Sequence, residues 1–295
     1  MNKVDELRKR ARELLESKAV KVFLGYKRSS QPGLSSPIFI TRPEDAEQLI
    51  FDFSCSQNLT NYLLKLKVEE SKPEGLPYIR GDSREPRGKI GVVARGCDSR
   101  SIVILLQEKQ VERESLYILG VGCEGVIENG EKSPSCRSCL YPNPVIYDEM
   151  VGEKVEPSPE LVEDEFDNLS FDERWQILSE EISRCIRCYA CRQVCPNCYC
   201  PVCFVDASMP QLLGKTHSLS DNMVFHIGRA LHMAGRCVEC GACHRACPMG
   251  IDLMRFNRKV ARIVKERFGA VAGVDLNQPP ALTQYQPEDP QEFIK

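Results

Sequence analysis

Apolar residues recur at helical spacing in the first segment of the chain and at strand spacing in the next two. Residues 4–17 predict an amphipathic helix, because their apolar positions fall on one face: Val4, Leu7, Ala11 and Leu14. Two runs of β-branched and aromatic residues follow, at 20–26 and 37–41, with turn-forming residues between them. These runs predict two strands. Short helices are expected after residue 42 and at 58–67.

A more distinct unit lies at residues 89–121. Residues 89–94 and 116–121 are short apolar runs, and 101–109 between them has the length and pattern of a helix. Strand, helix and strand in so short a segment indicate a βαβ unit, with parallel strands and a right-handed crossover. We therefore expect an α/β N-terminal domain with a parallel βαβ core, spanning residues 1–152.

The second half of the chain is predicted to be all α-helical. Ser170 and Glu173 form a capping box that begins a helix. We expect one face of that helix to pack in the core, with Phe171, Trp175, Leu178 and Ile182. Further helices are predicted at 223–234 and at 253–268, the latter between Asp252 as N-cap and Gly269. The helical domain spans 170–269, after an acidic linker at 153–169 and before an extended tail at 270–295.

Composition is that of an ordinary globular protein of 295 residues, with 42% hydrophobic and 27% charged residues. The net charge of −3 gives no reason to expect nucleic acid or an anionic membrane as a partner. No apolar run approaches the roughly 20 residues that span a bilayer, and residues 1–10 lack the apolar core of a secretory signal. Sixteen cysteines without such a signal indicate metal ligation in a reducing compartment, so we expect a cytoplasmic protein.

Two cysteine runs, at 185–196 and 237–248, share the pattern C-x2-C-x2-C-x3-C-P, which is typical of bacterial ferredoxins. Three cysteines of a run hold one 4Fe–4S cluster, and the fourth ligates the cluster of the other run. The pattern assigns the first cluster to Cys185, Cys188, Cys191 and Cys247. It assigns the second cluster to Cys237, Cys240, Cys243 and Cys195.

Two four-cysteine zinc sites, forming a structural scaffold, are the alternative for these runs. Zinc does not need a third cysteine three residues on, or the proline that follows the fourth, so the pattern favours iron. The histidines of this region are not needed as ligands, because both clusters are already complete. Three further cysteines are surplus to both, and they either adjust the nearby cluster or bind a group of their own: Cys198, Cys200 and Cys203.

Four more cysteines accompany the βαβ unit. Cys97 follows its first strand, Cys123 follows its second, and a C-x2-C pair comes soon after at Cys136 and Cys139. They predict a third metal site, expected to be another 4Fe–4S cluster; the alternative is that they pack as small apolar side chains. Open α/β sheets place ligands at the turn after a strand, which makes three residues candidates for cofactor binding: Gly96, Asp98 and Arg100.

Residues 91–122 and the cysteines after them resemble the beta subunits of deazaflavin-reducing hydrogenase and of formate dehydrogenase. In that family a strand–turn–Cys–helix segment, a strand ending in Cys and a C-x2-C pair recur in this order. The resemblance implies an electron-transfer subunit that often carries FAD. It also implies a third 4Fe–4S cluster, held by Cys97, Cys123, Cys136 and Cys139.

Residues 170–269 resemble the helical ferredoxin domain of heterodisulfide reductase gamma subunits, through the two cysteine runs and residues 249–253. The two resemblances together imply a subunit of an anaerobic redox complex. It would relay electrons between a catalytic subunit of formate dehydrogenase or hydrogenase type and a flavoprotein of heterodisulfide-reductase type. The alternative is an FAD-containing oxidoreductase that acts directly on a deazaflavin or nicotinamide carrier. The chain shows no paired carboxylates or nucleophile–base motif, so no catalytic residue is predicted.

Overall fold

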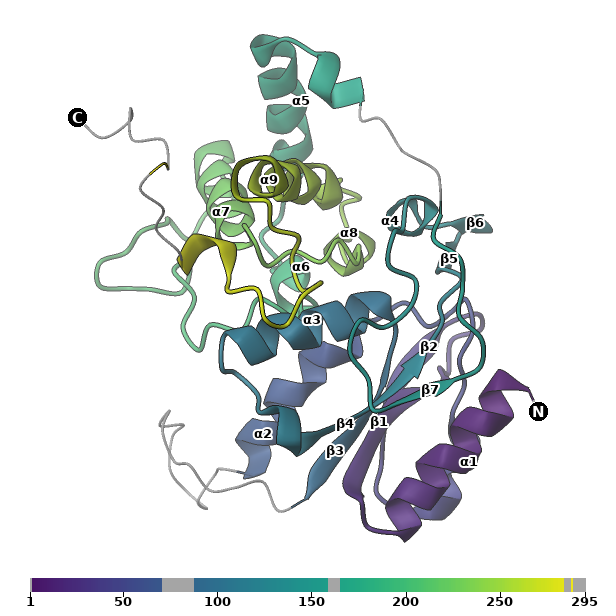
Figure 1. The fold of residues 1–295 in the computed structure, drawn as a ribbon. Coiled ribbons are helices and arrows are strands. Elements are labelled where there is room, and N and C mark those ends of the chain that lie inside the picture. The colour runs from purple at the N-terminus through teal and green to yellow at the C-terminus, as the bar shows by residue number, and fades with distance from the viewer. Residues whose placement is uncertain (1, 71–87, 159–164, 284–287, 289–295) are drawn as a thin grey trace.

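The computed structural model describes residues 2–70, 88–158, 165–283 and 288, and has a sheet-containing half and a helical half (Figure 1). The elements of the first half are α1 (Lys3–Glu16), β1 (Val20–Arg28), β2 (Ser35–Ile40), η1 (Pro43–Gln48), η2 (Leu59–Tyr62), α2 (Leu63–Glu70), β3 (Lys89–Ala94), α3 (Gly96–Gln107), η3 (Arg113–Ser115), β4 (Leu116–Val121), β5 (Ile127–Glu128), β6 (Glu131–Lys132), α4 (Pro134–Arg137) and β7 (Glu149–Val151). The second half contains η4 (Glu165–Asn168), α5 (Phe171–Ser183), α6 (Ala190–Gln193), α7 (Leu219–His232), α8 (Ala242–Arg245), α9 (Leu253–Phe268) and η5 (Ala281–Thr283).

The first half is a mixed sheet with the strand order β2-β1-β3-β4-β7. Within this sheet β1 and β2 pair antiparallel, whereas β1–β3, β3–β4 and β4–β7 are parallel pairs, and β5 and β6 form a separate antiparallel pair. The predicted βαβ unit is confirmed as β3, α3 and β4, with Val92 opposite Ile118. Its strands are buried on both faces, which explains their unbroken apolar runs. In Figure 1, α1 lies on the far side of the sheet from the helical half, and α3 lies between the sheet and that half.

The crossover helix α3 begins at Gly96, five residues earlier than the apolar pattern predicts. Its first turn is buried and polar, and therefore lacks the apolar periodicity by which the rest of the helix is recognised. Asp98 stabilises this start. Its carboxylate accepts hydrogen bonds from the backbone N–H of Arg95, at 3.1 Å, and from the Nε of Arg95, at 2.9 Å. Cys97, Asp98 and Arg100 thus lie on a helix rather than in a loop.

The helical half confirms two predicted helix boundaries. Ser170 and Glu173 form the predicted capping box of α5, and Asp252 caps α9 by accepting from the backbone N–H of Arg255 at 3.3 Å. The expected core face of α5 is wrong at its N-terminal end, since Phe171 is 72% exposed and Trp175 is 50% exposed. Because this end of α5 extends away from the helices it would pack on (Figure 1), its apolar face stays at the surface.

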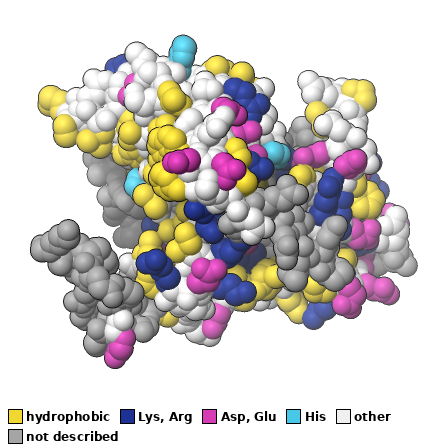
Figure 2. Space-filling view, turned by 90° about the horizontal axis from the view of Figure 1, so that it is seen from above, with side chains coloured by type: hydrophobic (Ala, Val, Ile, Leu, Met, Phe, Trp, Pro, Cys, Tyr) yellow, Lys and Arg dark blue, Asp and Glu magenta, His cyan; other side chains and the backbone are white. Residues whose placement is uncertain are grey.

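Two further observations concern the surface and the helices. Figure 2 shows apolar side chains reaching the surface among basic and acidic ones on the face seen from above. None of the described helices combines the length and the apolar character that crossing a membrane requires.

Polar side chains hold the two halves together, mostly through arginines that donate to backbone carbonyls. Arg100 donates to the carbonyl oxygens of Ala272, at 3.0 Å, and of Val238, at 3.2 Å. Arg245 donates to Ser56 O at 2.8 Å, and Arg236 forms an ion pair with Glu108 at 2.5 Å. Through these long-range contacts, the helical half packs on α3 and on the residues beside it.

Part of the expected extended tail also packs against α3. Gln107 Nε2 donates to Asp275 O at 2.9 Å, and Ala281 is buried against the helical half. This packing differs from the expected extended tail, and small side chains in the segment explain it. The backbone of Gly273 lies against that of Arg100 with no room for a Cβ. The remainder of the tail, 284–287 and 289–295, lies outside the described residues, as do 159–164 of the expected linker.

The Arg95–Asp98 pair predicts a large stability effect, because both side chains are buried. Asp98→Asn leaves the guanidinium of Arg95 buried without its counter-charge, which should lower the free energy of unfolding by about 3–5 kcal/mol. Denaturant unfolding of anaerobically prepared protein, followed by circular dichroism, measures this. Glu47→Gln is the matched control, since the Arg12–Glu47 pair is largely exposed and its loss should cost less than about 1 kcal/mol. Equal effects of the two substitutions would contradict the assignment.

Candidate metal centres

Four cysteines line a small cavity in the helical half. The first run contributes Cys185, Cys188 and Cys191, and the second run contributes Cys247. The other lining side chains are mostly apolar and include Phe225, Ile251 and Leu253. The set of cysteines is the one that the spacing assigns to the first cluster.

A second small cavity repeats this arrangement with the runs exchanged. The second run contributes Cys237, Cys240 and Cys243, and the first contributes Cys195. Four thiols around one space are the donor set of a 4Fe–4S cluster, so the residues present fit that group. That these eight side chains ligate iron stays a prediction, but the exchange of the fourth cysteine between the runs is a feature of the fold.

The two runs fold alike because the same backbone positions take left-handed conformations. In the first run these are Arg187 and Tyr189, with φ of 53° and 60°. In the second they are Glu239 and Gly241, with φ of 58° and 72°. Such residues curl the chain around the space, and Arg187 N donates to Cys185 Sγ at 3.3 Å. The one-turn helices α6 and α8 begin directly after Tyr189 and Gly241 and carry the third cysteine of each run.

The cysteines of both cavities lie in surroundings that oppose a bare thiolate. Burial raises the pKa of Cys191 to about 11 and that of Cys195 to about 12, although the charge of Arg229 acts in the opposite direction. Thiols with such pKa values stay protonated at neutral pH unless a positive centre binds them, and metal binding then releases the protons. Burial of this kind therefore suits cysteines whose charge is neutralised by bound metal.

Among the described residues, no three side chains of His, Cys, Asp or Glu approach one another closely enough to hold one metal ion. A cube of four irons and four sulfides is a larger centre, and its thiolates stand further apart.

Three side chains that the sequence analysis did not single out support these cysteines. His226 Nε2 lies 3.2 Å from Cys185 Sγ, and Asn257 Nδ2 lies 3.6 Å from Cys243 Sγ. Arg229 Nη2 donates to Cys191 O at 3.1 Å. Burial, and then the charge of Arg229, lowers the pKa of His226 to about 4, so its imidazole is neutral at pH 7. One feature of the sequence indicates these contacts. His226 and Arg229 stand three residues apart in a helix between the two runs, so they share one face of that helix.

The four cysteines of the first half are linked by electrostatic influence, Cys97 and Cys139 each with Cys123, and Cys97 also with Cys240 of the second cavity. Burial, and after it the nearby charges of Asp98, Cys240 and Cys123, raises the pKa of Cys97. Burial, and then the charges of Cys136 and Cys123, raises the pKa of Cys139. Cys97 thus neighbours both Cys123 of its own group and Cys240 of the second cavity. Whether these four bind metal stays a prediction.

The three cysteine groups therefore follow one another through the molecule. Cys191 of the first cavity lies within electrostatic reach of Cys243 of the second, and Cys240 of the second lies within reach of Cys97 of the third. Adjacent sites of this kind suit the transfer of single electrons.

The predicted cofactor residues Gly96, Asp98 and Arg100 all lie at the start of α3, where they contact protein. Gly96 has the backbone of Tyr141 against it, and Asp98 binds Arg95. Arg100 lies over the ring of Tyr141, with 4.5 Å from its Cζ to the ring centroid, in addition to its hydrogen bonds to the second half. A role in cofactor binding stays a prediction for all three.

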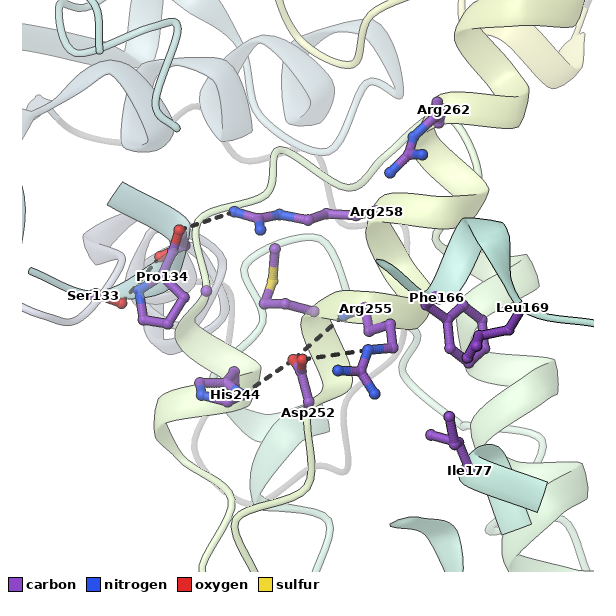
Figure 3. A pocket seen from close by; sticks show the side chains of 13 residues that line it. Ser133, Pro134, Phe166, Leu169, Ile177, His244, Asp252, Arg255, Arg258 and Arg262 are labelled. Carbon is purple, nitrogen blue, oxygen red and sulfur yellow. Dashed lines mark hydrogen bonds and ion pairs between the residues drawn. The ribbon is translucent and has the colours of Figure 1, made fainter. Parts of the chain in front are cut away.

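Two larger pockets lie beside these centres. The three surplus cysteines, Cys198, Cys200 and Cys203, line a pocket of about 540 Å³ together with Arg192, Arg229 and other residues. A pocket of about 410 Å³ lies between the halves (Figure 3). There the carboxylate of Asp252 interacts with His244 and Arg255, and Arg258 donates to Pro134 O at 3.3 Å. Basic side chains thus surround the second pocket, but protein groups already engage those of Arg255 and Arg258.

Comparisons with known proteins bear on both halves. Residues 180–251 match the family model described as a 4Fe–4S dicluster domain. The chain is 32% identical over 119 residues to the F420-dependent formate dehydrogenase subunit beta of Methanocaldococcus jannaschii, covering 40% of this chain and 29% of that protein. It is 34% identical over 133 residues to F420-dependent formate dehydrogenase 1 subunit beta of Methanococcus maripaludis, covering 44% and 33%. The chain thus spans about a third of the length of these curated relatives.

Among solved structures, the chain is similar to a chain in the F420-reducing [NiFe] hydrogenase complex from Methanosarcina barkeri. It shares 13% identity, has a TM-score of 0.30, and the match covers 47% of this chain and 44% of that one. So low a score carries no argument about the fold. The comparisons therefore support an iron–sulfur protein similar to beta subunits of formate dehydrogenase, and the dicluster match agrees with the two cysteine runs.

The exchange of the fourth cysteine predicts how substitutions group. Cys195→Ser should alter the same electron paramagnetic resonance signal as Cys240→Ser, because both line the second cavity. Cys247→Ser should instead match Cys188→Ser, which lines the first. Spectra of the reduced variants sort the four. Signals that group by run, Cys195 with Cys188 and Cys247 with Cys240, would show the assignment to be wrong.

The N-terminal cysteines predict a loss of iron on substitution. Cys123→Ser or Cys139→Ser in the full chain should each lower the iron content by about four atoms if the group holds a third cluster. Iron analysis of anaerobically purified protein measures the loss. Cys200→Ser is the control, since Cys200 is exposed and outside the three groups. Iron content equal to that of the unsubstituted chain would assign these cysteines to packing.

Proposed function

We propose that this chain is an iron–sulfur electron-transfer subunit of an anaerobic redox complex. It relays electrons between a catalytic subunit of formate dehydrogenase or hydrogenase type and a flavoprotein of heterodisulfide-reductase type. The observation that carries the proposal is the succession of three cysteine groups, which extends from the helical half to the edge of the sheet. The similarity to formate dehydrogenase beta subunits supports the kind of complex.

The first two centres would be held by the eight cysteines of the two cavities, and the third by Cys97, Cys123, Cys136 and Cys139. Clusters of this class accept and donate one electron at a time, at potentials set by burial, net charge and hydrogen bonds to sulfur. The chain supplies those conditions. Apolar side chains line much of the first cavity, and His226 and Asn257 contact cysteine sulfurs.

A relay requires an entry and an exit, and the ends of the succession suggest where they lie. The first cavity opens near Cys188, which is exposed, and near Ile186, which is 53% exposed. The third group lies in the sheet-containing half, where Cys136 and Cys139 are half-buried. Two partner surfaces, one in each half, are consistent with a position between two redox proteins.

A flavoenzyme acting directly on a soluble carrier would require a flavin site in this chain. The start of α3 is the candidate place, but Asp98 and Arg100 are bonded there to other parts of the protein. No observation favours this function over the relay, and the flavin content of the purified chain tests it.

The proposed function predicts the metal content of the anaerobically purified chain. We expect a broad brown absorption and about eight irons per chain, or about twelve if the third group is also filled. Reduction by dithionite should bleach the absorption, and a catalytic partner should reduce the chain with its own substrate. Stoichiometric zinc without iron would overturn the proposal. Stoichiometric flavin with rapid turnover of a deazaflavin or nicotinamide by the chain alone would replace it with the flavoenzyme.

A further inference from the structure

Arg229 is a buried cation without a carboxylate partner. It lies on α7 and is 5% exposed. Its Nη2 donates to Cys191 O, whereas its Nε has no hydrogen-bond partner among the described residues. Among the described residues, no carboxylate oxygen lies within 4.0 Å of a guanidinium nitrogen of Arg229. A buried charge is costly unless it is paired and hydrogen-bonded, so the structure requires a negative group that would face this side chain.

The position of Arg229 identifies that negative group. Its side chain lines the second cavity, together with Cys195 and Cys243, and it is bonded to the backbone of Cys191, which lines the first. Cysteines of both cavities, and Cys198 beside them, lie within electrostatic reach of its guanidinium. Two half-buried arginines near the cysteines differ in this respect, because Arg187 lies 3.7 Å from Asp221 and Arg245 lies 3.4 Å from Glu128.

We propose that Arg229 is the shared counter-ion of the two candidate clusters, donates its free Nε–H to the second one, and raises the reduction potentials of both. The inference rests on the proposed function. A cluster with four thiolates is anionic and gains a further negative charge on reduction. A nearby buried cation therefore stabilises the reduced state more than the oxidised one. The effect is larger at the second cluster, because Arg229 lines the second of the two cluster cavities and not the first.

Anaerobic redox titration of the full chain, followed by electron paramagnetic resonance, tests the role. Arg229→Gln should make reduction of the second cluster at least tenfold less favourable, which for one electron is about 59 mV. The first cluster should shift in the same direction by less. Arg229→Lys keeps the charge but not the planar donor. Its reduction potentials should lie between those of the unsubstituted chain and those of Arg229→Gln. The control is Arg192→Gln, since Arg192 already has Asp206 at 2.7 Å, and its potentials should match those of the unsubstituted chain.

A second measurement does not depend on whether the glutamine variant assembles its clusters. In protein labelled with ¹⁵N only at arginine, pulsed resonance of the reduced second cluster should show a ¹⁵N coupling that Arg229→Lys abolishes. Arg245, which donates to Cys240 O, contributes equally to both spectra and so cancels.

The possible outcomes distinguish this inference from the proposed function on which it rests. Iron-loaded Arg229→Gln with both potentials unchanged, or no ¹⁵N coupling lost in Arg229→Lys, would overturn the role of Arg229 alone. Absence of iron from the unsubstituted chain would overturn the proposed function and this inference with it.

Discussion

The interlocking of the two cysteine runs is the constraint on which the helical half depends. Each cavity takes three cysteines from one run and the fourth from the other, so Cys195 and Cys247 must cross between them. This crossing requires the two runs to lie side by side, and α6 and α8 are in contact for that reason. The connecting helix α7 can then pass both cavities with one face, which brings His226 and Arg229 to the cysteines.

The two halves meet where the second cavity approaches the start of α3. The hydrogen bonds from Arg100 to Val238 and Ala272 fix that helix to the loop preceding Cys240 and to the segment after α9. Arg245 holds the same loop to Ser56 of the first half. Guanidinium groups suit such a role, because one planar fork satisfies several carbonyl oxygens in a buried place. The distance between the second and third cysteine groups is thereby determined by structure rather than by a flexible linker.

Sequence patterns predicted the elements with strong local signals. The strands β3 and β4, the capping box of α5 and the limits of α9 follow from apolar runs, from Ser170 and from Asp252 and Gly269. The cysteine spacing likewise predicted which eight residues share the two cavities. Patterns failed where tertiary context decides. The polar first turn of α3 has no periodicity, the burial of Trp175 depends on neighbours that α5 does not meet, and the contacts of Arg229 exist only once two distant runs are together.

The two runs place different residues at the second position that takes a left-handed backbone conformation. Gly241 takes a positive φ without a steric cost, whereas Tyr189 takes it in the first run despite its side chain. Tyr189 also lies against the ring of Phe225 at 5.2 Å between centroids and receives a hydrogen bond from Arg187 at 2.8 Å. The two motifs are thus unequal copies of one loop. In the first, Tyr189 is one of the residues that line the cavity, and in the second, Ser135 of the sheet-containing half lies where a Cβ of residue 241 would stand. Exchange of the two loops would preserve every cysteine and yet bring a tyrosine side chain against Ser135, at a contact between the two halves.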